Sequence, residues 1–96
     1  MKQIPREPPL ADVMRARDSI RGFIAARRGV PMILTPHGVV HAGIAESIGE
    51  YRDSLAIAAL DDLVSESDLE YGDHGPFRYA TPQAASVLHL AKQRAL

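Results

Sequence analysis

The residues of this chain best suited to catalysis or ligand binding are three histidines, His37, His41 and His74. An imidazole titrates near neutral pH and offers a nitrogen that can bind metal. His37 and His41 lie four residues apart and His74 follows Asp73, but neither spacing is the helical H-E-x-x-H pattern of zinc enzymes. The three histidines are therefore a weak ligand-binding candidate beside the interpretation that they are ordinary turn and strand residues. We expect no metal site and no cofactor.

Motifs for nucleophilic catalysis and for phosphate binding are missing from the sequence. It contains no cysteine, no G-x-S-x-G nucleophile elbow, and neither of the glycine-rich loops that hold nucleotide phosphates. The carboxylates between residues 61 and 73 lack the spacing of a calcium loop, which favours a solvated acidic segment. We therefore predict a protein that is not an enzyme.

Charge is distributed unevenly along the 96 residues, although the net charge is only −1. Residues 1 to 30 hold seven cations and three carboxylates, whereas residues 45 to 75 hold nine carboxylates and one arginine. Three further cations follow residue 77. Both basic ends can therefore be attracted to the acidic middle, within one chain or between copies.

The partner-binding candidates follow from this distribution. They are arginines on or just beyond a predicted first helix and two carboxylates of the acidic segment: Arg15, Arg17, Arg21, Arg27, Arg28, Asp61 and Asp62. Because arginine pairs well with phosphate, binding of DNA or RNA is the main alternative. A pI near 6.4 and few aromatic residues argue against it. The predicted order of elements is loosely similar to that of a helix-turn-helix with a wing, yet no segment shows two short helices joined by a compact glycine turn.

The first helix is predicted over about residues 9 to 28, after an extended or disordered lead-in over residues 1 to 8 that is rich in proline. Arg17 and Arg21 project near the centre of its apolar arc, so they either extend their charged ends to water or meet carboxylates. The arc at helical spacing comprises Leu10, Val13, Met14, Ile20, Phe23 and Ile24.

Two short strands are predicted over residues 30 to 44, joined by a turn at Thr35-Pro36-His37-Gly38. Both faces of this hairpin are mostly apolar, which implies that both are covered, by helices or by another subunit.

A second helix is predicted from about Ile48 to Val64, because Ser47-Ile48-Gly49-Glu50 matches a capping box. The helix has apolar residues on two nearly opposite sides, which places it in the centre of the fold or at a subunit interface. The alternative is a buried strand over Ser54 to Leu60.

The end of the chain is predicted to form an exposed loop over residues 65 to 76, a third strand over Phe77 to Ala80, and a helix that starts at Thr81-Pro82. The order α-β-β-α-β-α predicts a small α+β fold, with a short antiparallel sheet packed by helices and one domain over residues 9 to 96.

These patterns favour a non-catalytic interaction or regulatory protein that binds another macromolecule and is a homo-oligomer, most simply a dimer. We expect Arg17 and Arg21 to matter most. The alternatives are a DNA- or RNA-binding regulator that uses the first helix, and a small enzyme or ligand-binding protein that uses the histidines. Since the sequence has no cysteine and no apolar run of membrane-spanning length, we expect a cytoplasmic protein without a membrane partner. The high alanine and arginine content is typical of a bacterial or phage coding sequence.

Overall fold

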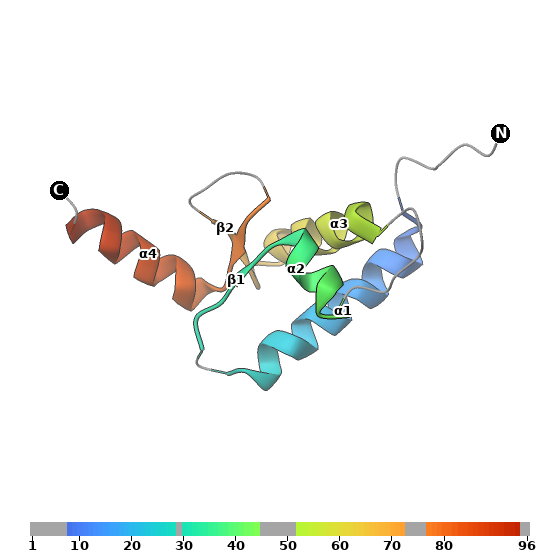
Figure 1. Ribbon diagram of the computed structural model, residues 1–96, viewed down its shortest axis with the longest axis horizontal. Coiled ribbons are helices and arrows are strands. Elements are labelled where there is room, and N and C mark those ends of the chain that lie inside the picture. Colours follow the sequence, from blue (N-terminus) through green and yellow to red (C-terminus); the bar gives the residue numbers. More distant parts are fainter. Residues whose placement is uncertain (1–7, 29, 45–51, 73–76, 95–96) are drawn as a thin grey trace.

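The computed structural model describes residues 8–28, 30–44, 52–72 and 77–94. These form four helices and three two-residue strands (Figure 1). In chain order the elements are α1 (Leu10–Ala26), β1 (Ile33–Leu34), α2 (Pro36–His41), α3 (Arg52–Ser65), β2 (Glu70–Tyr71), β3 (Tyr79–Ala80) and α4 (Pro82–Arg94). The predicted α+β class, with a short antiparallel sheet packed by helices, is confirmed.

The sheet has the strand order β1-β3-β2, and both strand pairs are antiparallel. Tyr79 in the central strand β3 lies opposite Leu34 on one side and Tyr71 on the other. The Tyr79 side chain is fully buried. Of the strand predicted over Phe77 to Ala80, the last two residues form β3, and Tyr79 joins the sheet to the helical core.

Helix α3 is the centre of the core, because it packs against both α1 and α2. Leu55, Leu60 and Leu63 of α3 are fully buried, and Ile20 of α1 and Val39 of α2 are buried against the same cluster. The predicted burial of this helix on two sides is thus met by two neighbouring helices. The alternative of a strand over Ser54 to Leu60 is wrong.

The predicted hairpin over residues 30 to 44 is wrong in its second half. Only β1 forms, and the residues after it make the short helix α2. Thr35 caps this helix, since its backbone is extended and its Oγ1 accepts a hydrogen bond of 3.0 Å from the N–H of Gly38. Pro36 occupies the first turn, where a missing N–H costs nothing. Val39 then faces the core instead of a sheet.

The predicted exposed loop over residues 65 to 76 is also partly wrong, because Glu70 and Tyr71 pair with β3 as strand β2. The helix predicted to start at Thr81-Pro82 is correct: Thr81 Oγ1 accepts a bond of 3.2 Å from the N–H of Ala84. Parts of the predictions lie outside the described residues: residues 1 to 7 of the lead-in predicted over residues 1 to 8, the capping box at 47–50, and residues 73 to 76 of the predicted loop.

Helix α4 leaves the sheet and projects away from α1, α2 and α3 (Figure 1). Its first turn is anchored, since Ala84 is buried and the helix packs on β3. Further along, Val87 and Leu90 are 54% and 55% exposed. Among the described helices, none has both the length and the apolar character needed to cross a membrane.

Candidate functional site

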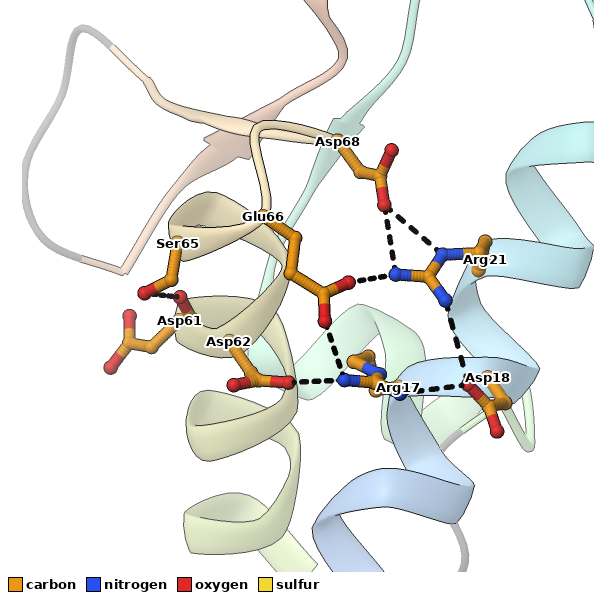
Figure 2. Close-up of polar contacts among 8 residues, drawn as sticks. All are labelled: Arg17, Asp18, Arg21, Asp61, Asp62, Ser65, Glu66 and Asp68. Carbon is orange, nitrogen blue, oxygen red and sulfur yellow. Dashed lines mark hydrogen bonds and ion pairs between the residues drawn. The ribbon is translucent and has the colours of Figure 1, made fainter.

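The contact between α1 and α3 contains a cluster of charged side chains, the ionic cluster, which comprises Arg17, Asp18, Arg21, Asp62, Glu66 and Asp68 (Figure 2). Nη1 of Arg17 donates to Asp62 Oδ2 at 3.0 Å and to Glu66 Oε1 at 2.6 Å. Arg21 donates from Nε to Asp68 Oδ2 at 3.0 Å, and its Nη2 also pairs with Glu66. Glu66 therefore bridges the two arginines, and the cluster ties the middle of α1 to the end of α3.

Arg17 is the more enclosed of the two arginines, with its side chain 13% exposed against 42% for Arg21. The hydrogen bond to Asp62 raises the pKa of Arg17, and the bond to Asp68 raises the pKa of Arg21. Both stay charged at any physiological pH. Of the two expectations for these arginines, the structure shows the second, because they meet carboxylates of the acidic segment.

Asp61, one residue before Asp62, does not join this cluster. Its Oδ1 accepts a hydrogen bond of 2.7 Å from the hydroxyl of Tyr79 and one of 3.3 Å from that of Tyr71. Burial, reinforced by this contact, raises the pKa of Tyr79, and the negative charge of Asp61 raises that of Tyr71. The two predicted partner-binding carboxylates, both on α3, therefore have different partners: Asp62 contacts Arg17 of α1, and Asp61 contacts two tyrosines of the sheet.

The other predicted arginines do not form one basic patch with Arg17 and Arg21. Arg15 pairs with Asp12 one turn away on the same helix. Arg27 lies 3.4 Å above the ring of Phe23 and donates to its carbonyl. Arg28 is exposed just beyond the end of α1. Sequence reasoning grouped these residues by helix, but the structure gives each its own local environment.

Helix α2 places His37 and His41 side by side, with ring centroids 6.4 Å apart and planes 14° from parallel. Both residues are exposed. Among the residues that the structure describes, no group of three or more histidines, cysteines or carboxylates is arranged to hold a metal ion. His74 lies outside the described residues, so the three predicted histidines are not seen together.

The outward side of α3 combines small apolar and acidic residues. This surface, the α3 face, consists of Asp53, Ser54, Ile57, Ala58 and Asp61. It has two carboxylates and no lysine or arginine, and Ile57 and Ala58 are half-buried. A groove lies on each side of it, so the α3 face is a ridge between two hollows.

The first hollow, the α1 groove, is formed where Pro8, Leu10 and Val13 face α3, and it has a volume of about 640 Å³. Leu10 is 75% exposed at its rim. The second hollow, of about 420 Å³, lies toward α2 and β3, and Ile57 lines both hollows. Its other lining residues are Thr35, Pro36, His37, Asp53, Phe77 and Arg78.

Sequence reasoning missed most of this surface. The two-sided apolar pattern of the α3 segment predicted a central helix or a subunit interface, Leu10 was assigned to the apolar arc of α1, and Phe77 was assigned to a strand. Both are exposed, at 75% and 58%. Glu66 and Asp68 were counted in the acidic segment without a role, although they hold the two arginines.

Comparisons with protein-family models, with curated proteins and with solved structures found no match for this chain.

Proposed function

We propose that the protein is a non-catalytic binding module whose α3 face docks an apolar, basic segment of a protein partner. The observation that carries the proposal is the α3 face with its two hollows: apolar side chains stand exposed around carboxylates, on a surface that the chain's own described elements leave open.

The charges of the described residues support a basic partner. Arg17 and Arg21, the strongest cationic candidates in the sequence, are engaged by carboxylates of α3 and of the segment that follows it. At the α3 face the charges are those of Asp53 and Asp61. A partner that brings lysine or arginine next to apolar side chains complements this surface in both respects.

DNA binding is the second candidate, and the connectivity favours it. Two helices, α2 and α3, follow β1, and the antiparallel pair β2 and β3 completes the sheet in the order β1-β3-β2. This topology resembles a helix-turn-helix followed by a wing, in which the second helix of the pair enters the major groove. The likeness is one of fold alone.

The electrostatics of α3 favour the protein partner over DNA. In a helix-turn-helix complex the outward side of α3 would lie between phosphates, and here that side carries the carboxylates of Asp53 and Asp61. Arg78 and His37 line the neighbouring hollow. If the protein binds DNA through these residues, the binding should be weak and sensitive to salt. A cytoplasmic location and a bacterial or phage origin remain part of the proposal, on the composition alone.

The experiment compares Ile57→Glu with Val30→Glu, an equally drastic change at an exposed valine away from the α3 face. A partner protein is first isolated by its binding to the wild-type chain and is then purified. The proposal requires that this partner bind the wild type and Val30→Glu with the same affinity. The partner must bind Ile57→Glu at least about tenfold more weakly, as expected for a central interface residue. Equal binding by all three chains would overturn the proposal.

A salt titration against duplex DNA decides between the two candidates. Phosphate contacts weaken steeply with salt, so binding at low salt that Arg78→Ala reduces would favour the second candidate. Absence of binding at low salt removes it.

A further inference from the structure

The structure holds a segment with the properties required of the partner, and it belongs to the chain itself. Helix α4 spans Pro82–Arg94 and contains no aspartate or glutamate, while Lys92 and Arg94 stand in its last turn. Val87 and Leu90 are more than half exposed on it. The helix is therefore both apolar and basic, which makes it complementary in charge to the α3 face.

Within one chain, α4 does not cover the α3 face. It packs on β3 and points away from α1 and α3, so that the sheet lies between α4 and these helices (Figure 1). Among the described residues the groove has a volume of about 640 Å³ and is lined by residues that include Leu10, Val13, Ile57, Ala58 and Asp61. The chain thus contains both a groove with this lining and a helix with this composition, and the helix does not occupy the groove of its own chain.

We propose that α4 of one copy docks in the α1 groove of a second copy, and that the second copy returns its own α4 to the first. Such a reciprocal exchange closes on itself with two-fold symmetry and leaves no free α4 or groove to extend a chain of copies. Val87 and Leu90 fill the apolar part of the groove, and the last turn of α4, which contains Lys92 and Arg94, lies toward Asp61. This inference rests on the proposed function, since it names the partner of the same surface.

The test is sedimentation equilibrium of the full chain at micromolar concentrations, with two variants that each damage one half of the contact. Leu90→Glu alters α4 and leaves the groove intact. Leu10→Glu alters the groove and leaves α4 intact, and at a residue that is 75% exposed the new carboxylate leaves the core unchanged. The wild type and the control Val30→Glu are expected to be dimers, and each variant is expected to be a monomer.

An equimolar mixture of the two variants then separates this arrangement from any other. The Leu90→Glu copy still offers a groove and the Leu10→Glu copy still offers a helix, so the mixture regains one of the two contacts and forms a heterodimer. Dimerisation of Leu10→Glu alone at the wild-type strength, or a mixture that stays monomeric, overturns docking of α4 in the groove.

The double change Lys92→Glu/Arg94→Glu tests the charge complementarity. It should weaken the dimer at low salt, and an unchanged or tighter dimer contradicts the assigned orientation. A wild-type chain that is monomeric throughout would overturn the exchange of α4 but not the proposed function, which the Ile57→Glu comparison with a purified partner decides independently.

Discussion

The two sides of α3 differ in the partners of their charged side chains. On the side toward α1, Asp62 and the following Glu66 hold Arg17 and Arg21, so that the charges are matched within the chain. On the outward side, Ile57 and Ala58 lie beside Asp53 and Asp61 with open hollows on both flanks. One side has its charges paired within the chain, and the other combines half-buried apolar side chains with Asp53 and with Asp61, whose carboxylate accepts hydrogen bonds from two tyrosines.

This difference shows that the residues with the strongest charge signal are not the ones most available for binding. Arg17 and Arg21 were expected to bind a partner, and within the described structure their guanidinium groups are engaged by carboxylates of the same chain. The apolar surface that exceeds the needs of a small core lies elsewhere, around Ile57 and along α4. Interaction surfaces are more often defined by such apolar anchors than by charge alone.

The largest expected effect contrasts two neighbours on α3. Leu60 is fully buried, so Leu60→Ala should lower the free energy of unfolding by about 2–5 kcal/mol. Ile57 is half-buried on the outward side, so Ile57→Ala should cost the isolated chain about 1 kcal/mol or less. Urea denaturation measures both. Equal losses would mean that Ile57 is a core residue and that the α3 face is not a free surface.

The ionic cluster should give the next largest effect. Arg17→Ala removes the more enclosed arginine and leaves Asp62 and Glu66 with a reduced cationic environment, so its melting temperature should fall more than that of Arg21→Ala. Arg15→Ala is the matched control, since its pair with Asp12 lies on the surface of one helix. Thermal melts at low and high salt rank the three variants. The same melting temperature for Arg17→Ala and Arg15→Ala would contradict a structural role for the cluster.

The third prediction concerns Tyr79 and its bond to Asp61. Tyr79→Phe leaves the carboxylate of Asp61 without its shorter hydrogen bond and should cost about 1.5–3 kcal/mol at neutral pH, the range for bonds to charged groups. Urea denaturation at pH 7 measures this loss. No change in stability would show that the phenol contributes by packing alone.

The same tyrosine predicts a loss of stability in alkali. Burial raises the pKa of Tyr79 above its ordinary value near 10, so the folded state keeps the proton more tightly than the unfolded state does. The resulting stabilisation is complete below pH about 10 and is lost as the pH rises further, toward the raised pKa of the folded protein. Tyr79→Phe should flatten this alkaline decline in urea midpoints. An equally steep decline in the variant would assign it to other groups.

The helices and the ion pairs were largely predictable from the sequence, and the reason is that their signals are local. The proline after a capping threonine located the start of α4, and the placement of Arg17 and Arg21 within an apolar arc left two alternatives, of which the structure shows pairing with carboxylates. The same Thr-Pro signal begins α2 at Thr35-Pro36, where Gly38 and the alternating residues after it favoured a turn and a strand. The cap outweighs the glycine there because Val39 gains burial against α3.

The remaining features depend on contacts between distant segments. Strand β2 consists of Glu70 and Tyr71 in a polar, acidic stretch, and it is a strand only because Tyr79 and Ala80 pair with it. The α1 groove likewise combines Leu10 with Ile57, which are far apart in the sequence. A single sequence carries no pattern that brings such residues together, so the candidate surface had to come from the structure.

Thr81 tests how firmly α4 is attached, with a smaller expected effect. Its Oγ1 accepts hydrogen bonds of 3.2 Å from the N–H groups of Met32 and Ala84, and so joins the start of α4 to the segment before β1. Thr81→Ala should lower the free energy of unfolding by about 1 kcal/mol, as for other lost caps. Hydrogen exchange should show faster exchange at the first turn of α4. Unchanged exchange there would mean that packing of Ala84 alone holds the helix.

The smallest effect is expected on α4 beyond its anchored turn. Val87 is 54% exposed, so in the isolated chain Val87→Ser should change the free energy of unfolding by no more than about 0.5 kcal/mol. The measurement must be made at a concentration low enough to dissociate any dimer, because association would stabilise the folded state by mass action. If the wild type then gains stability over Val87→Ser as the concentration is raised, the exposed side of α4 is buried only on association. A loss already present at the lowest concentration would place Val87 in the core of the single chain. The exposed side of α4 would then not be a surface available for binding.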